Sequence, residues 1–87
     1  MLDAMIGQPV VIDLRTTYVV LGTLHAVDDH WLDVRNADFH DLRDSDSTRE
    51  QYVAMSLATG VKRNRKRVLV VRGDVIAVSL LKDVTDE

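Results

Sequence analysis

Arg72, Gly73 and Asp74 interrupt an apolar run, "VVRGDVIAV" at residues 70–78. A strand that only had to be buried would not carry a guanidinium and a carboxylate at this point. The two charged side chains could form an ion pair across a turn, which contributes little to stability at a surface. They could instead face a ligand, because a guanidinium offers both charge and a flat face for stacking. The residues alone leave both interpretations open.

A second notable feature is the basic segment "KRNRKR" at residues 62–67. It holds five of the 11 Lys and Arg residues of a chain whose net charge is −3, so positive charge is concentrated here. Residues 38–50 hold five of the acids. A basic segment of this density contacts phosphates in nucleic-acid-binding proteins, but it also occurs as a solvated lead-in to a strand.

The residue types argue against an enzyme, a metal centre and a cofactor. The chain has no cysteine, which removes disulfides and thiolate ligands. No serine or threonine stands in a recognisable nucleophile motif. The "HAVDDH" stretch at residues 25–30 has two histidines and two aspartates, but nothing in it favours the geometry of a metal site.

Length and composition predict one globular domain over residues 1–87. Apolar residues make up 46% and charged residues 29% of the chain, which is ordinary for a folded domain. No apolar run approaches the roughly 18 residues of a membrane span, and the N-terminus does not resemble a signal peptide. We therefore expect a cytoplasmic protein that does not contact a membrane.

Five short strands are expected to carry and place these residues. β-branched and apolar residues predict them at residues 8–14, 18–27, 31–37, 67–71 and 75–81. In the first strand, Val10, Ile12 and Leu14 occupy alternate positions, as residues on one buried face do. Gly22, inside the second, indicates a strong bend or a close backbone approach. The pattern favours a mostly β fold: a small, strongly bent, partly open antiparallel barrel.

Residues 38–65 separate the third predicted strand from the fourth. Ser47 and Glu50 have capping-box spacing, and "REQYVAMSLAT" ends at Gly60, which could terminate a helix. The stretch "YVAMSL" also alternates enough to extend a strand. We prefer a short helix.

With these strands in place, the chain resembles the Sm/LSm family in two stretches. "VVLGTLHAVDDHWLDVRNA" is similar to the first signature of that family, and "RVLVVRGDVIAVSLL" to the second. Together with the first strand, the resemblance covers about residues 7–37 and 66–82, with residues 38–65 as an insert. It implies a bent five-stranded barrel whose subunits join edge to edge in a ring of five to seven.

The resemblance also implies a pocket for one base per subunit, between the loop before the third strand and the loop before the fifth. His30 falls at the stacking position, Arg72 at the basic wall, and Asp74 at the carboxylate that orients the arginine. Asp28 falls at the aspartate that orders the first loop. Gly73 would permit a tight turn or a positive φ that aims its two neighbours at one spot.

One position departs from the family pattern. Leu32 stands where the family has an asparagine that reads the base edge, and leucine can neither donate nor accept a hydrogen bond. Trp31 precedes it, and strand alternation predicts that its side chain lies in the core. Selection of uracil by hydrogen bonding is therefore not expected.

Two functions follow from these observations. The first is a ring that binds single-stranded RNA at the pocket, with Lys62, Arg63 and Arg65 contacting phosphates nearby. The second is an oligomeric scaffold with a decayed RNA site, in which the insert at residues 38–65 supplies a surface for a protein partner. The basic segment and Arg72 favour the first; Leu32, the acidic insert and the net charge favour the second.

Overall fold

A computed structural model describes residues 1–85 of the chain. Within them it contains five β-strands, one α-helix and four short 3-10 turns. The strands are β1 (Pro9–Leu14), β2 (Tyr18–Val27), β3 (Trp31–Asp41), β4 (Arg65–Val71) and β5 (Val75–Leu80), and the helix is α1 (Arg49–Thr59). The turns are η1 (Leu2–Met5), η2 (Leu42–Asp44), η3 (Arg72–Asp74) and η4 (Leu81–Asp83).

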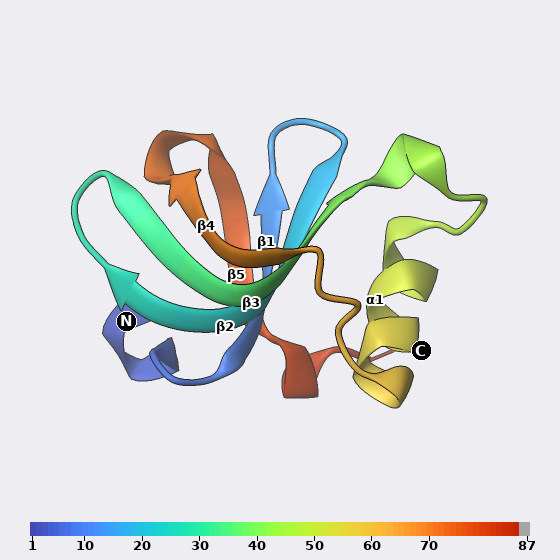
Figure 1. Cartoon of the computed structure of the whole chain (residues 1–87), viewed down its shortest axis with the longest axis horizontal. Helices are drawn as coiled ribbons and strands as arrows, with labels where there is room; N and C mark the ends of the chain where they lie inside the picture. The colour runs from blue at the N-terminus through green and yellow to red at the C-terminus, as the bar shows by residue number, and fades with distance from the viewer. Residues whose placement is uncertain (86–87) are drawn as a thin grey trace.

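The strands form one antiparallel sheet in the order β4-β3-β2-β1-β5. Strands β1 to β3 follow one another as a meander, β4 adds to β3, and β5 returns to pair with β1 (Figure 1). Strands β4 and β5 are therefore the two edges, although only η3 separates them along the chain. The predicted mostly β fold, with five antiparallel strands in an open, bent sheet, is confirmed.

Gly22 of β2 lies very close to the backbone of β3. The pairing of β2 with β3 shifts register between Leu21 and Thr23, and Asn36 of β3 adopts a positive φ of 50°. A Cβ on Gly22 would lie 2.8 Å from Val34 Cγ1 and 2.9 Å from the Arg35 carbonyl oxygen. No side chain fits there, so the predicted close backbone approach is confirmed.

The sheet has two cores, one on each face. The inner core is enclosed by the bent sheet and consists of Val10, Ile12, Leu14, Val20, Leu24, Leu32, Val34, Ala37 and Val70. The outer core lies on the opposite face, where Val11, Val19 and Leu21 pack against Val53 of α1 and against Leu81.

The outer core corrects the prediction for the first strand. Val10, Ile12 and Leu14 do share the inner face, but Val11 between them is also buried, at 3% exposure. Strand β1 is thus buried on both faces rather than on one. The uninterrupted apolar runs "VVI" and "YVVL" were the available signal, because a strand covered on both faces does not alternate.

Helix α1 stands beside the sheet, next to the C-terminal segment (Figure 1). The predictions of a helix here and of its C-terminal glycine are correct: Gly60, at φ 95°, donates its N–H to the Ser56 carbonyl at 2.9 Å. Within residues 1–85, no helix combines the length and apolar character needed to cross a membrane.

The helix begins one residue later than predicted. Thr48, not Ser47, is the N-cap: its Oγ1 accepts from the Gln51 N–H at 3.2 Å, and Gln51 Oε1 accepts from the Thr48 N–H at 3.0 Å. The capping box is therefore Thr48 with Gln51 instead of Ser47 with Glu50. Both hydroxyls have a suitable partner three residues on, so spacing alone could not separate them.

Asp38 anchors α1 to the sheet. This carboxylate is 1% exposed; it accepts a hydrogen bond from the Tyr52 hydroxyl of α1 and one at 3.1 Å from Asn64 Nδ2, just before β4. The Tyr52 ring also stacks on His40 of β3, with centroids 3.8 Å apart. Burial and the hydrogen bond to Asp38 raise the pKa of Tyr52. Helix, β3 and the start of β4 are thus tied together at one point.

We predict that Thr48→Ala lowers the free energy of unfolding by about 1 kcal/mol, because it leaves the first turn of α1 without its side-chain acceptor. Ser47→Ala, which changes a hydroxyl one position away, should leave it within about 0.5 kcal/mol. Urea denaturation of both variants measures the difference. Equal losses of stability in the two would contradict the assignment of Thr48 as the cap.

Candidate nucleic-acid interface

The loop between β2 and β3 meets η3, which connects β4 to β5. The backbone N–H of Arg72 donates to the His30 carbonyl at 2.9 Å, and Arg72 Nη1 donates to the Asp28 carbonyl at 2.6 Å. His30 and Arg72 are therefore neighbours in space, although they lie far apart in the sequence. The structure brings these two predicted site residues together.

Asp28 orders the loop that carries His30. Its Oδ1 accepts from the backbone N–H groups of His30 and Trp31, both at 2.8 Å. These two bonds are the main reason why the pKa of Asp28 lies below its usual range. An ionised carboxylate that holds two N–H groups fixes a tight turn, which is the role expected of Asp28.

An open hollow of about 720 Å³ lies where the two loops meet. Its lining consists of Asp29, His30, Trp31, Val71, Arg72 and Gly73. Two flat polar groups, an imidazole and a guanidinium, thus border a space open to solvent. Among residues 1–85, no three His, Cys, Asp or Glu side chains gather as metal ligands would.

Asp74 does not orient Arg72 as predicted. The side-chain ion pairs in the described part of the chain are Arg35–Asp33, Arg43–Asp41, Arg49–Asp13 and Arg67–Asp33, so the alternative of a turn ion pair between Arg72 and Asp74 is wrong as well. The carbonyl of Asp28 holds the guanidinium instead. Asp74 uses its own carbonyl to accept from the Arg15 N–H at 3.0 Å, which ties η3 to the turn after β1.

The tight turn expected at Gly73 is present as η3, but the alternative of a positive φ is not. The glycines with positive φ are Gly7 and Gly60, and η3 is a 3-10 turn that other residues can adopt. A Cβ on Gly73 would meet nothing within 4 Å. The chain itself leaves room for a side chain there, so the fold of one subunit does not require glycine at this position.

The prediction placed Trp31 in the core and Leu32 at the pocket, and the structure shows the reverse. Leu32 is fully buried in the inner core, paired with Val27 and Val70, whereas Trp31 is 44% exposed. Strand alternation holds, but its phase is the reverse of the predicted one. An asparagine at position 32 would bury an amide among apolar side chains, so it could not reach a base edge.

The basic segment lies away from the hollow. Strand β4 runs antiparallel to β3, with Val71 opposite Trp31 and Arg65 opposite Ala37. Because β4 has seven residues, its ends are roughly 20 Å apart. Lys62, Arg63 and Arg65 thus stand at the far end of the β3–β4 ribbon, not beside His30 and Arg72 as predicted.

A second hollow, of about 510 Å³, lies at that far end, and we call it the basic hollow. It is lined by Asn36, Arg63, Asn64, Arg65 and Lys66. Arg63 Nη1 donates to Asn36 Oδ1 at 3.3 Å, so the positive φ of Asn36 in β3 places its amide beside the basic segment. Three positive charges surround this space.

Asp33, between the two ends, holds two guanidinium groups. Arg35 donates to it at 3.0 and 3.2 Å, and Arg67 at 3.2 and 3.1 Å. The hydrogen bond from Arg35 is the largest of the causes that lower the pKa of Asp33 to about 2. With two guanidinium groups on one carboxylate, the cluster keeps one net positive charge. No sequence signal pointed to it, since the three residues meet only across the strands.

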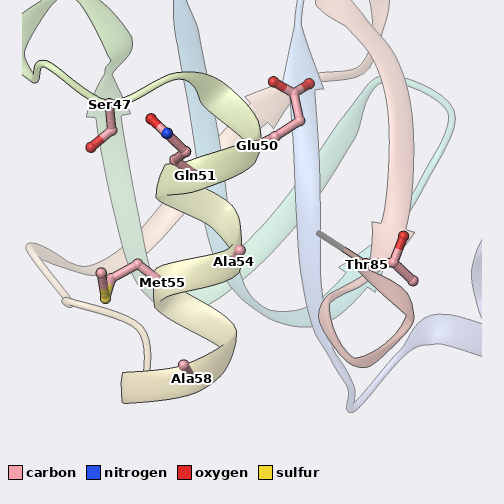
Figure 2. A pocket seen from close by; sticks show the side chains of 7 residues that line it. All are labelled: Ser47, Glu50, Gln51, Ala54, Met55, Ala58 and Thr85. Atoms are coloured by element: carbon pink, nitrogen blue, oxygen red, sulfur yellow. The ribbon is translucent and has the colours of Figure 1, made fainter. Parts of the chain in front are cut away.

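A third surface is the exposed side of α1. Figure 2 shows the helix residues that border a hollow of about 550 Å³, with Thr85 of the C-terminal segment across from them. The lining consists of Ser47, Glu50, Gln51, Ala54, Met55, Ala58 and Thr85. Met55 remains 56% exposed. This surface belongs to the insert.

Comparisons with known proteins identify the fold. No family model and no curated protein matches the chain. Among solved structures, a Pyrococcus abyssii Sm protein in complex with a uridine heptamer has 15% identity and a TM-score of 0.62, over 90% of this chain and 89% of that one. A heptameric archaeal Sm protein has 21% identity and a TM-score of 0.60, over 91% and 93%.

A chain from the NatC complex bound to CoA is equally similar. It has 20% identity and a TM-score of 0.62, and the match covers 98% of this chain and 95% of that one. The protein therefore has an Sm-like fold, as the two signature stretches indicated. Within this fold, its insert carries α1.

We predict that stability falls as pH drops from about 4 to about 2, in part because of Asp33. Its folded pKa of about 2 lies below an unfolded value of about 3.9, so its contribution is complete above that unfolded value and is lost on acidification through the folded one. Asp33→Asn should make the unfolding free energy less steep in pH across this window. Asp29→Asn, an exposed loop carboxylate, should keep the wild-type slope in denaturant titrations; equal slopes in all three proteins would contradict the role of Asp33.

Proposed function

We propose that this protein binds single-stranded RNA at the His30–Arg72 hollow, as one subunit of a ring of five to seven copies. The observation that carries the proposal is the junction of the two loops, where Arg72 bonds to both His30 and Asp28. The Pyrococcus abyssii Sm protein of the same fold, in complex with a uridine heptamer, supports RNA as the ligand. A cytoplasmic location stays a prediction.

The chemistry of the hollow suits a stacked base. One Nη1 bond to the Asp28 carbonyl restrains the Arg72 guanidinium and leaves its other donors free. His30 is exposed at the same opening and offers a second flat face. Stacking of this kind contributes roughly 1–3 kcal/mol per base and tolerates any base. With Leu32 buried, position 32 supplies no group for reading the base edge.

The edges of the sheet support a ring. Strands β4 and β5 each have one side without a partner strand in the described subunit. Leu69 and Val71 on β4 are each 47% exposed, and Ile76 on β5 is 63% exposed. Apolar open edges aggregate unless they are paired. Pairing β4 of one copy with β5 of the next satisfies both edges, and closure of the ring removes all of them.

For the assembly, we predict a mass several times the 9.8 kDa of one chain in light scattering at micromolar concentration. Ile76→Arg should shift the protein to monomer without unfolding it, because it places a charge on the β5 edge. Met55→Arg, at a similarly exposed position on α1, should leave the mass unchanged. A monomeric wild-type protein would rule out the ring.

For RNA binding, we predict that Arg72→Ala weakens the affinity for short single-stranded RNA by roughly 1–3 kcal/mol while leaving the salt dependence mostly in place. Neutralising Lys62, Arg63 and Arg65 should instead reduce the slope of log K against log salt by about 0.7 for each phosphate that these side chains neutralise. Titrations at several salt concentrations separate the two effects, with Lys82→Gln as the control for removal of one charge elsewhere. If Arg72→Ala binds as the wild type does, the hollow is not the site.

A second candidate function is an oligomeric scaffold without an RNA site. The observation that favours it is the exposed side of α1, where Met55 borders the hollow in Figure 2. The similar chain from the NatC complex supports it too, because it occurs within a protein complex. An assembled wild-type ring that binds no RNA at low salt would favour the scaffold; saturable RNA binding would favour the first proposal.

A further inference from the structure

Trp31 lies between two hollows. It borders the His30–Arg72 hollow on one side and a smaller one, of about 240 Å³, on the other. The smaller hollow is lined by Ala26, Val27, Asp28, Trp31, Asp33, Arg67 and Leu69. A large aromatic side chain that is 44% exposed between two open spaces is a ready platform for a flat ligand.

The register of β3 and β4 places further groups on the same face as Trp31. Asp33 pairs with Leu69, and Arg35 pairs with Arg67, in the alternation that starts with Trp31. The residues between them point into the inner core. We call this side of the sheet the outer ribbon face and define it by Trp31, Asp33, Arg35, Arg67 and Leu69. The outer core, with its helix, lies over β1 and β2 and includes none of these five residues.

Positive charge continues along the outer ribbon face. The Asp33 cluster retains one net positive charge, because Arg35 and Arg67 share one carboxylate. Lys66, one residue before Arg67, lies on the opposite side of β4 by strand alternation and borders the basic hollow together with Arg63. The three hollows therefore follow the β3–β4 ribbon in order, and Trp31 joins the first two. A negatively charged strand with flat bases fits this sequence of groups.

We propose that single-stranded RNA lies along the outer ribbon face, with one base stacked on Trp31 and its phosphates near Arg35 and Arg67. This inference rests on the proposed function and extends it: the strand continues from the His30–Arg72 hollow toward the basic hollow. The two hollows lie roughly 20 Å apart. One base in a single pocket cannot span that distance, but a continuous strand can contact both hollows. A strand of about four nucleotides or more is required, the lower end of single-strand site sizes.

Trp31 is the single tryptophan of the chain, so intrinsic fluorescence reports on contact with this one side chain, which borders both hollows. We would titrate wild-type protein with a labelled oligo(A) and a labelled oligo(U), each about twice the minimal length of roughly four nucleotides. Anisotropy of the label measures binding, and tryptophan emission measures contact at Trp31. We expect emission to be quenched in step with anisotropy. The Arg72→Ala protein should still show the quenching, at higher RNA concentration.

Variants separate stacking from charge. Trp31→Ala should weaken binding about tenfold, and Trp31→Phe should restore most of the affinity because it keeps an aromatic face. Arg67→Gln should lower the salt slope by about 0.7. Met55→Ala and Lys82→Gln are the matched controls for an exposed apolar residue and a charge elsewhere. Circular dichroism checks that each variant is folded.

The outcomes distinguish this inference from the function on which it rests. Saturable anisotropy with unchanged tryptophan emission overturns the outer ribbon face and leaves the His30–Arg72 site standing. No binding of either RNA at low salt overturns the proposed function, and this inference with it. Quenching in step with anisotropy, together with weaker binding of Trp31→Ala under conditions where Met55→Ala binds normally, supports the strand across Trp31.

Discussion

Apolar side chains on both faces of β1 and β2 decide how the other elements are arranged. Val10 points into the inner core and Val11 into the outer one, and both are buried. Exposing a valine that could be buried costs about 1.5 kcal/mol or more, so the outer face of the sheet needs a cover. Helix α1 provides it through Val53, and the buried carboxylate of Asp38 fixes where the helix sits.

The position of that cover determines which surfaces remain free. Helix α1 packs over Val11 and Leu21, at the part of the sheet nearest β1, and the β3–β4 ribbon keeps an accessible outer face. Trp31 and Leu69 stay half exposed there. Insertion of a helix between β3 and β4 therefore shapes two surfaces: it builds the exposed side of α1 and leaves the ribbon open. The scaffold candidate uses the exposed side of α1, and the RNA path proposed across Trp31 uses the open ribbon face.

The sequence is informative where a feature depends on nearby residues. The existence of five strands, the close approach at Gly22 and the existence of a helix in the insert all follow from local patterns. The end of the third strand does not: β3 runs to Asp41, beyond the predicted 31–37, and so takes in the start of the expected insert. The predicted cap is one residue off because Ser47 and Thr48 offer the same chemistry at adjacent positions. The prediction for Trp31 is wrong because alternation shows only that Trp31 and Leu32 lie on opposite faces of β3. Which of the two faces is buried depends on what the rest of the chain packs against it. The partner of Arg72 could not be predicted for a similar reason. It is the backbone carbonyl of Asp28 in a distant loop, and every residue type has such a carbonyl.

The pairing of β1 with β5 affects the order in which the strands fold. It joins Val10 to Leu80, near opposite ends of the chain, whereas β1 to β3 form a meander of neighbours. Contacts between such distant segments form slowly compared with local ones. Strand β5 is thus expected to dock last, and its outward edge exists only once it has docked. In the proposed ring, completion of the subunit would therefore act as a checkpoint, because an unfinished chain has no β5 edge to pair with a neighbour.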